Sequence, residues 1–476
     1  MMGGQGNVPP FVDAGVETNP PRALPIIALD AGTADGAGGR VFSVTAQRGR
    51  AQLLAGVSST TLGYNGALLG PALRLRSGQQ TTIRVHNQLS EATTAHWHGL
   101  IVPADMDGGP HQLIAPGATW EARFTVANSA STCWFHPHVH GATGRQVVAG
   151  LAGLLIVDDA AGPATNLPST WGVDDLALVL QDKRFTAAGE IDYSLDTSEP
   201  WRGYTGERLL VNGAFAPEWQ APRQWVRLRL LNGCNARILS LRLGGSLPWV
   251  QVANEGGLLA APLARASLVL APGERAEMLV DFSAVATGSV LALYAASVGD
   301  GFGFGMGMGS SSDTSETTAL TIRVSLPRQP GAIVAPPGSL ATAPAVFASA
   351  GATLRSFTLD GGMMGSPFTI NARRFDMQRI DFAVPANRVE VWRFFNATGM
   401  AHPMHVHGVP MSLLSRDGVP PPAYERGLRD TFVVGPMQQL SVAVQTPALA
   451  SATPLMLHCH ILEHEDAGMM SQFVTV

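Results

Sequence analysis

Thirteen residues near the C-terminus carry a thiol, three imidazoles and a thioether. The segment reads Leu457-His458-Cys459-His460-Ile461-Leu462-Glu463-His464-Glu465-Asp466-Ala467-Gly468-Met469. A thiolate, two imidazoles and a distant thioether are the ligands of blue electron-transfer copper sites. If the segment is extended, its side chains alternate, so Cys459 points to one side and His458 and His460 point to the other. We therefore predict two neighbouring metal sites that are joined by a few covalent bonds.

The histidines of this chain are concentrated in pairs separated by one residue. Scattering 13 histidines evenly over 476 residues would give about a third of one His-x-His pair. Residues two apart on a strand share a face, so each pair can present two imidazoles to one metal site. No histidine lies between His140 and His402, so the metals are expected in the first and last parts of the chain or between them. Five such pairs occur: His96/His98, His136/His138, His138/His140, His405/His407 and His458/His460.

A weak internal repeat indicates the elements that position these residues. Asn65, Asn212 and Asn371 each stand in a similar turn, and each turn precedes an alternating β-rich strand that ends in Asn. The copies lie about one domain length apart, which indicates three homologous β domains rather than a solenoid. The three strands cover residues 82–87, 226–232 and 389–396.

Strand signals dominate the rest of the chain and predict an all-β fold. Short runs of Val, Ile, Leu and Phe alternate with turn residues, and 53 Gly and 33 Pro disfavour long helices. Greek-key β-sandwiches are the natural class. Polar or Pro-rich stretches at 158–171 and 327–344 are candidate boundaries. We predict domains at 26–160, 161–326 and 346–476, with a linker at 327–345.

A glycine-rich run, Gly301–Gly309, is interpreted as a mobile loop. Its Met306 and Met308 could touch a soft metal, but incidental methionines in an exposed loop are the preferred interpretation.

The composition excludes some classes of function. The chain is 46% hydrophobic and 14% charged, with a formal net charge of −5, so it offers no basic patch for nucleic acid. The longest apolar run, near Val147–Val157, is too short and glycine-broken to span a bilayer and is interpreted as a buried strand. No signal peptide is visible, which indicates either a removed leader or a cytoplasmic protein. Cys133 and Cys234 are expected to be buried thiols, although a bond between them is an alternative.

Four segments of the chain together resemble the copper-binding motifs of multicopper oxidases. They are His96-Trp97-His98-Gly99, Trp134-Phe135-His136-Pro137-His138, His402-Pro403-Met404-His405-Val406-His407-Gly408, and His458-Cys459-His460 through Met469. The order and spacing match over essentially the whole chain. One His-x-His motif is weak evidence, whereas four in this order are highly specific. The family contains laccases, bilirubin oxidases and bacterial cuprous oxidases, all built from cupredoxin domains. Within it, 133–138 and 231–237 are most similar to three-domain bacterial copper-efflux oxidases.

The resemblance implies four copper ions and twelve ligands. Eight of the ten implied imidazole ligands, four from each of two domains, would form a site at the interface that neither domain could build alone. The type 1 copper would take His402, Cys459 and His464, with Met469 as axial ligand. The type 2 copper would take His96 and His405. The type 3 pair would share His98, His136, His138, His407, His458 and His460.

Three histidines remain outside this set. His140 exceeds the ligand count and is expected beside the site or facing solvent, and His86 and His111 are expected to be structural.

Reduction of dioxygen to water consumes protons, so a buried cluster needs acids that pass protons inward. Glu465, beside His464, and Asp107, in Asp107-Gly108-Gly109, match positions where the family carries such acids. The alternatives are a solvated charge for Glu465 and an Asp-Gly turn for Asp107. Asp466 stays unassigned between the two roles.

The resemblance is incomplete on the side where a reductant would bind. Cuprous oxidases of the family carry a long Met-rich insertion in the third domain and an acid four residues before the first type 1 histidine. Here only Asp360-Gly361-Gly362-Met363-Met364 stands in place of the insertion, and the acid position is Thr398. Met400 does match a methionine of the cuprous site, with ordinary packing as the alternative. The missing insertion predicts an open type 1 face that admits phenols and aromatic amines.

We therefore predict a laccase-like multicopper oxidase. It would couple one-electron oxidation of phenols or aromatic amines to four-electron reduction of O2 to water, and the alternative is a cuprous oxidase for copper detoxification. The expected partners are O2 and a small reductant (a phenol, an aromatic amine or Cu(I)), without nucleic acid or a membrane span, and the expected state is a monomer. A periplasmic or secreted location is implied by the family alone.

Two rival functions are disfavoured. A non-catalytic cupredoxin-domain protein is disfavoured because all twelve ligands are present. A copper nitrite reductase is disfavoured because such chains usually have two domains and lack the full set of paired histidines.

Overall fold

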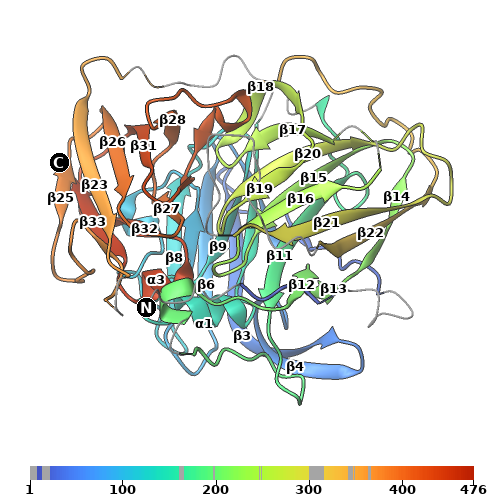
Figure 1. Ribbon diagram of the computed structural model, residues 1–476, viewed down its shortest axis with the longest axis horizontal. Coiled ribbons are helices and arrows are strands. Elements are labelled where there is room, and N and C mark those ends of the chain that lie inside the picture. Colours follow the sequence, from blue (N-terminus) through green and yellow to red (C-terminus); the bar gives the residue numbers. More distant parts are fainter. Residues whose placement is uncertain are drawn as a thin grey trace.

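The chain folds into three β-sandwiches; in Figure 1 the third (orange and red) lies to the left and the middle one (green and yellow) to the right. The computed structural model describes residues 8–12, 22–159, 166–196, 199–245, 247, 249–299, 316–340, 347, 349–362 and 366–476. The predicted all-β class is confirmed, and the α-helices among these residues are short. Each sandwich lies within one of the predicted segments, although the exact domain boundaries stay a prediction. The helices are α1 (Thr143–Val148), α2 (Glu199–Arg202) and α3 (Leu462–Asp466).

The first sandwich places two of the histidine pairs on adjacent strands. β7 (His96–His98) pairs antiparallel with β9 (Ser131–His136), and His96 lies opposite His136. Side chains directly opposite one another on paired strands lie close together, so this register brings the two motifs to one place. The sheet order is β1 (Leu29–Asp30), β5 (Ala72–Arg76), β10 (Gly153–Asp158), β9 and β7. The second sheet contains β2 (Thr33–Ala34), β3 (Arg40–Leu54), β6 (Gln80–Asn87) and β8 (Thr119–Thr125), with β4 (Val57–Tyr64) on β3.

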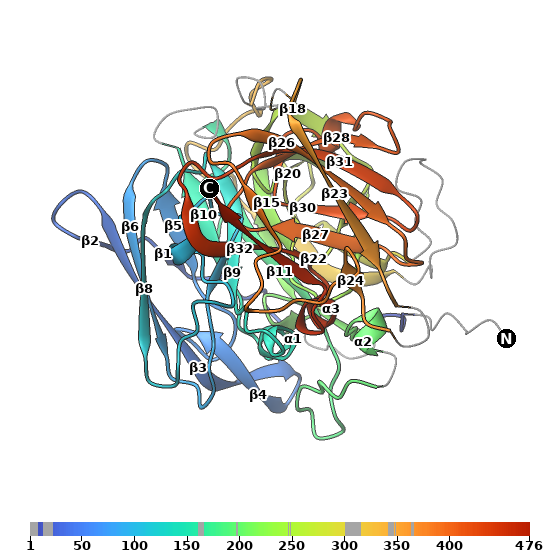
Figure 2. The same ribbon diagram turned by 90° about the vertical axis from the view of Figure 1, so that its left-hand side faces the viewer.

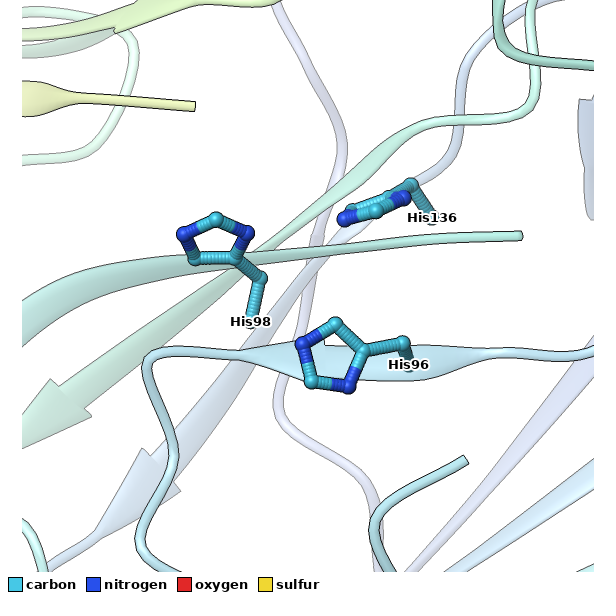
Figure 3. A group of neighbouring side chains, drawn as sticks. All are labelled: His96, His98 and His136. Carbon is cyan, nitrogen blue, oxygen red and sulfur yellow. The ribbon is translucent and has the colours of Figure 1, made fainter. Parts of the chain in front are cut away.

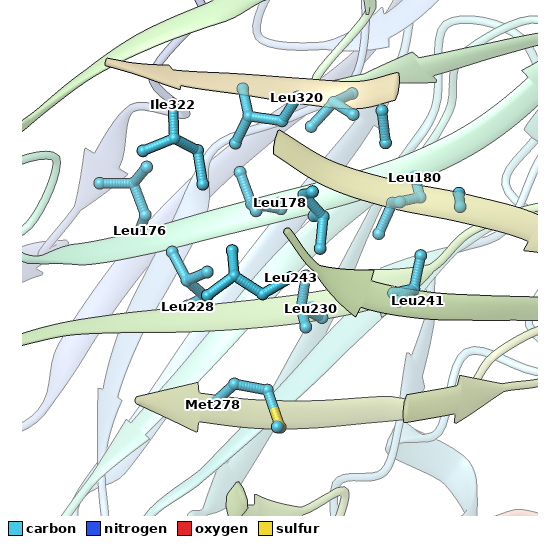
Figure 4. Close-up of a cluster of buried hydrophobic side chains, with 14 of the residues drawn as sticks. Leu176, Leu178, Leu180, Leu228, Leu230, Leu241, Leu243, Met278, Leu320 and Ile322 are labelled. Atoms are coloured by element: carbon cyan, nitrogen blue, oxygen red, sulfur yellow. The ribbon is translucent and has the colours of Figure 1, made fainter. Parts of the chain in front are cut away.

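The two sheets of the middle sandwich enclose a core that is rich in leucine (Figure 4). Leu176, Leu178 and Leu180 alternate along one strand and therefore share the face that meets the opposite sheet. The larger sheet has the order β13 (Ala214–Phe215), β12 (Arg208–Val211), β11 (Asp175–Lys183), β15 (Trp225–Asn232), β20 (Arg275–Asp281), β17 (Trp249–Asn254) and β18 (Gly257–Ala264). The smaller has the order β14 (Glu218–Pro222), β22 (Thr317–Leu326), β21 (Val290–Ser297), β16 (Leu239–Leu243) and β19 (Leu268–Leu270).

The third sandwich joins the two remaining histidine motifs. β27 (His402–Val406) pairs antiparallel with β32 (Ser451–Cys459), and His405 lies opposite His458. One sheet has the order β24 (Thr369–Ile370), β23 (Thr353–Asp360), β26 (Val389–Asn396), β31 (Gln439–Gln445), β28 (Met411–Arg416) and β29 (Leu428–Arg429). The other has the order β25 (Phe382–Val384), β33 (Met470–Thr475), β32, β27 and β30 (Thr431–Val434).

The internal repeat has a physical counterpart in its asparagines. Asn65, Asn212 and Asn371 all have positive φ, of 55°, 50° and 54°, a conformation that Asn tolerates better than most residues. The Oδ1 atom of each accepts a hydrogen bond, 2.7 to 2.8 Å long, from a backbone N–H of an earlier strand, which is β3, β11 or β23. The strands β6, β15 and β26 each end in Asn, as the repeat predicts. Three copies of one turn therefore organise three related sandwiches.

Three further expectations can be compared with the described residues. The apolar run near Val147–Val157 is not one strand: α1 ends at Val148 and β10 starts at Gly153, because the intervening glycine and small residues turn the chain. No helix among the described residues is long and apolar enough to cross a membrane. Cys133 and Cys234 are free and buried, as expected. The predicted loop Gly301–Gly309, with Met306 and Met308, lies outside the described residues.

Candidate metal centres

The thiol of Cys459 lies between two imidazoles in the third sandwich. β27 carries His402, β32 ends at Cys459, and α3 carries His464, so three elements of the third sandwich converge. The Sγ atom of Cys459 lies 3.5 Å from Nδ1 of His402 and 3.6 Å from Nδ1 of His464. All three side chains are fully buried, and so is Met469, whose backbone N–H donates to the carbonyl of His464 at 2.8 Å. The structure therefore brings the predicted thiolate group together.

In each of these imidazoles, Nε2 points away from Cys459 and has a hydrogen-bond partner. These hydrogen bonds fix the orientation of the rings toward the thiol. Nε2 of His402 lies 2.9 Å from the hydroxyl of Thr398, and that hydroxyl lies 2.7 Å from Oδ1 of Asn396. The amide nitrogen of Asn396 donates to backbone carbonyls, so its oxygen must accept the Thr398 proton. The Thr398 oxygen then accepts from Nε2–H of His402. This arrangement leaves Nδ1 unprotonated and facing Cys459, as a metal ligand requires.

The predicted open face beside this group is wrong. His402 and His464 are 0% exposed. The outer nitrogen of His464, Nε2, lies 3.0 Å from the carbonyl oxygen of Trp201 in α2, which belongs to the middle sandwich. Phe368 adds a second cover, because its ring centroid lies 4.4 Å from that of His464 and 4.9 Å from that of His402. The face lacks a long insertion but is closed by a neighbouring sandwich, which sequence spacing could not show.

Eight imidazoles from the first and third sandwiches form one buried cluster. Figure 3 shows three of them, His96, His98 and His136, converging from two strands. Nε2 of His96 lies 3.3 Å from Nε2 of His405 across the interface between the sandwiches. All eight are 0% exposed: His96, His98, His136, His138, His405, His407, His458 and His460.

In one part of this cluster, three imidazoles form a triangle in which their Nε2 atoms face one another. Nε2 of His458 lies 3.2 Å from Nε2 of His138 and 3.1 Å from Nε2 of His407. Nδ1 of His458 is turned toward the carbonyl of Cys459, 3.0 Å away. Three nitrogen atoms at this separation surround a space that a single metal ion can fill.

A second part of the cluster has buried ring nitrogens with no hydrogen-bond partner among the described residues. They include Nδ1 of His98, Nε2 of His136 and both nitrogens of His460. The ring of His460 lies 4.9 Å from that of His98 and 5.3 Å from that of His136. Buried polar atoms are rarely left without a partner in native proteins. These nitrogens therefore fit a metal ion as the missing partner.

Burial also sets the charge state of the imidazoles. It lowers the pKa of His98, His136, His138, His407, His458 and His460 well below the usual value, and neighbouring imidazoles lower it further. Burial likewise lowers the pKa of His464 to about 4. The neutral imidazole is the form that binds a metal.

The two predicted acids contact different imidazoles of the cluster. Oδ2 of Asp107 lies 2.7 Å from Nδ1 of His407. The two carboxylate oxygens of Glu465 each lie 3.2 Å from an Nδ1 atom, one of His138 and one of His458. Glu465 is 0% exposed, so the alternative of a solvated charge is wrong, and burial raises the pKa of its carboxyl well above the usual value. The side chain of Asp107 likewise contacts an imidazole, so Asp107 is more than a residue of an Asp-Gly turn.

The middle sandwich contributes an ion pair that the sequence did not reveal. Arg275 donates to both oxygens of Asp430, with distances of 2.9 and 2.6 Å. Oδ1 of Asp430 lies 3.0 Å from Nε2 of His98, and its backbone carbonyl lies 2.8 Å from Nδ1 of His405. Gly273 packs so closely that an added Cβ would lie 3.0 Å from the rings of His98 and His460. No motif marks these residues, because their pairing arises only when the sandwiches meet.

The short helix α3 joins all three sandwiches beside the thiolate group. Figure 2 shows α1, α2 and α3 gathered at one place, although each comes from a different sandwich. Glu463 and Asp466 flank His464 and bond outward in different directions. Glu463 accepts hydrogen bonds from the middle sandwich: from Tyr193 Oη (2.8 Å), Asn235 Nδ2 (2.7 Å) and Tyr204 N (2.8 Å). Asp466 accepts from the first sandwich: from Thr143 N and Gly144 N, both at 2.9 Å.

The remaining histidines stay outside both groups, as expected. Nδ1 of His86 lies 3.0 Å from the hydroxyl of Thr119, and Nε2 of His111 lies 2.7 Å from Oε1 of Gln472. His140 is exposed at the surface.

Comparison with known proteins agrees with this architecture. Two regions, 45–162 and 351–476, match the family described as multicopper oxidase. The multicopper oxidase mco of Staphylococcus haemolyticus is 36% identical over 442 residues, which cover 92% of this chain and 89% of that protein. Cell division protein FtsP of Xenorhabdus nematophila is 34% identical over 414 residues, covering 87% and 84%.

Solved structures show the same similarity. A laccase-like multicopper oxidase, CueO from an Ochrobactrum species, has a TM-score of 0.85 and 37% identity and covers 95% of this chain and 100% of its own. A laccase from Pediococcus acidilactici has a TM-score of 0.87 and 31% identity, with 99% and 96% covered. The chain therefore belongs to the multicopper oxidase family and has its cupredoxin fold. It is an oxidoreductase that uses oxygen and a reductant, and it binds copper.

Proposed function

We propose that the two groups of ligands hold four copper ions. The type 1 copper would be held by His402, Cys459, His464 and Met469, and the type 2 copper by His96 and His405. One type 3 copper takes the triangle of His138, His407 and His458. The other takes the imidazoles with unpartnered nitrogens, His98, His136 and His460.

We propose that the protein is a laccase-like oxidase of phenols or aromatic amines. Bound copper would accept single electrons at the thiolate group and deliver four electrons to O2 at the histidine cluster. The observation that carries the proposal is the position of Cys459 between His458 and His460 at the end of β32, because the chain itself joins the two groups there. Asp107 and Glu465 are held against the cluster imidazoles, where they supply protons.

Phenols are favoured over Cu(I) by the surroundings of His402. Soft thioether ligands favour a cuprous substrate, and the resemblance to cuprous oxidases implies an acid four residues before His402. The position of the acid is occupied by the hydroxyl of Thr398, which is already bonded to Asn396 and His402. Met400 packs against the core of the third sandwich. The Ochrobactrum relative is described as oxidising lignin model compounds and lignosulfonate, which also supports aromatic substrates.

Oxygen uptake tests this proposal. The copper-loaded protein is given a panel of phenols and aromatic amines, or Cu(I), with and without excess copper. We expect uptake with the phenols that is faster than with Cu(I). Uptake only with Cu(I) would support the alternative, a cuprous oxidase for copper detoxification, and no uptake with either reductant would contradict both.

The relatives described as cell division protein FtsP suggest a second candidate, a role in cell division in place of oxidation. The complete set of buried ligands favours an enzyme, and the colour of the loaded protein separates the two candidates. A thiolate–copper group makes the protein blue, whereas a chain that binds no type 1 copper stays colourless.

Replacing Glu465 tests its role in proton supply. We expect Glu465→Gln to slow oxygen uptake about a hundredfold, which is the lower end for loss of a positioned acid. The blue colour should remain, because Glu465 contacts His138 and His458 and not Cys459. Asp105→Asn is the control, since Asp105 is an exposed acid in the turn before Asp107. A Glu465→Gln protein with normal oxygen uptake would remove Glu465 from the mechanism.

We further propose a periplasmic or secreted location and the domain boundaries at 26–160, 161–326 and 346–476. The first rests on the family alone, and the second is supported by the three pairs of sheets.

A further inference from the structure

A reductant cannot touch either imidazole of the thiolate group directly. Both rings are fully buried, and each outer nitrogen already has a hydrogen-bond partner. For His402 the partner is Thr398, which is 5% exposed and bonded to Asn396. For His464 the partner is the backbone carbonyl of Trp201. Trp201 is therefore the next residue outward from His464.

Trp201 is connected to His464 by two routes. The first is the hydrogen bond of 3.0 Å from Nε2 of His464 to its carbonyl oxygen. The second passes through side chains, because the ring of Trp201 meets Phe368 edge to face at 6.3 Å, and Phe368 lies 4.4 Å from His464. The indole packs against the third sandwich but keeps part of its surface exposed. Trp201 is therefore partly exposed to solvent, and its ring is linked through Phe368 to the fully buried ring of His464.

We propose that Trp201 is the docking and electron-entry residue for aromatic reductants. This inference rests on the proposed function, with the type 1 copper at His402, Cys459 and His464. A phenol stacks on the exposed part of the indole, loses one electron through Trp201 to His464, and releases its proton to solvent. The phenol becomes a phenoxyl radical, and the type 1 centre is reduced by one electron.

The chemistry of an indole selects the class of substrate. A flat, electron-rich ring gains stacking contact with tryptophan, whereas Cu(I) seeks sulfur or nitrogen ligands that an indole does not supply. Trp201 thus explains how a closed type 1 face serves phenols and aromatic amines. It also makes the middle sandwich, which provides no predicted copper ligand, part of the substrate site.

The test compares Trp201→Leu with Trp201→Phe in the copper-loaded protein. We expect kcat/KM for phenols to fall about fivefold to tenfold in Trp201→Leu, because a stacked ring is lost. Trp201→Phe should recover most of this loss. Both variants keep the backbone carbonyl, so the charge-transfer colour and the paramagnetic resonance signal of the type 1 copper should not change. Oxidation of ferrocyanide, which does not stack, should be unaffected.

A second measurement does not depend on turnover. Binding of 4-nitrophenol, used as a poorly oxidised phenol, to the copper-free protein should be weakened in Trp201→Leu and retained in Trp225→Leu. Trp225 is a partly buried tryptophan elsewhere in the middle sandwich and serves as the matched control. Unchanged phenol oxidation and 4-nitrophenol binding in Trp201→Leu would overturn the proposal. Equal losses for phenols and ferrocyanide, or a lost blue colour, would also overturn it, because Trp201 would then be a packing residue. A wild-type protein without blue colour would instead refute the proposed function.

Discussion

Cys459→Ser is expected to give a folded protein that is colourless and takes up no oxygen above background. Cys459 provides the only thiol in either ligand group, and its side chain lies between Nδ1 of His402 and Nδ1 of His464. A serine hydroxyl has nearly the same size but is a hard, weakly acidic ligand that does not replace a thiolate at a soft copper site. The expected loss is therefore chemical and not structural. Visible absorption, copper content and oxygen uptake measure it.

The control for this variant is Cys234→Ser. Cys234 is a buried free thiol in the core of the middle sandwich, 3.8 Å from the carbonyl of Leu180, and it meets none of the predicted ligands. Replacing sulfur by oxygen at Cys234 should leave the colour and the oxygen uptake unchanged. Copper bound to the histidine cluster should survive in Cys459→Ser, since its eight imidazoles are untouched. A blue Cys459→Ser protein would contradict the assignment of the type 1 group.

Arg275→Met is expected to lose oxygen uptake as well but to keep the blue colour. Arg275 holds Asp430 with two hydrogen bonds, and Asp430 in turn contacts His98 and His405. Without the guanidinium, a buried carboxylate loses its charge partner, which costs about 3 to 5 kcal/mol of unfolding free energy. Loss of such outer partners also lowers metal affinity by about 10- to 100-fold. Copper should therefore leave the histidine cluster before it leaves the thiolate group.

The matched control for Arg275→Met is Arg229→Met. Arg229 is also buried and paired, with Asp175 at 2.7 Å and Glu277 at 3.0 Å, but it contacts no histidine. We expect a similar loss of stability in chemical denaturation, with full copper content and normal oxygen uptake after correction for folded protein. If both variants lose copper and oxygen uptake equally, the effect of Arg275 is on folding alone.

The sequence predicted the ligand groups because their spacing is local. Side chains two residues apart on an extended segment point to the same face. His458 and His460 were therefore expected to point away from the side chain of Cys459, whatever the position of the strand in the fold. The all-β class followed for the same reason, since turns and alternating strands are local patterns. The positive φ angles of Asn65, Asn212 and Asn371 show that even the repeat was a local signal.

What the sequence missed depends on contacts between sandwiches. The Arg275–Asp430 pair joins residues 155 positions apart, and the cover of His464 comes from Trp201, 263 positions away. An insertion that is absent from the third sandwich was interpreted as an open face, but α2 of the middle sandwich closes it. Pairings of this kind carry no periodicity, and only the assembled structure reveals them.

The position of α3 has a consequence for how the protein matures. His464 sits on a five-residue helix that is fastened to the middle sandwich through Glu463 and to the first through Asp466. So short a helix has little stability of its own, so its shape depends on these outside bonds. The blue colour would therefore develop only after all three sandwiches have docked, and it would fade as soon as any one of them separates. We therefore expect the colour to report the assembly of the whole molecule rather than the folding of the third sandwich alone.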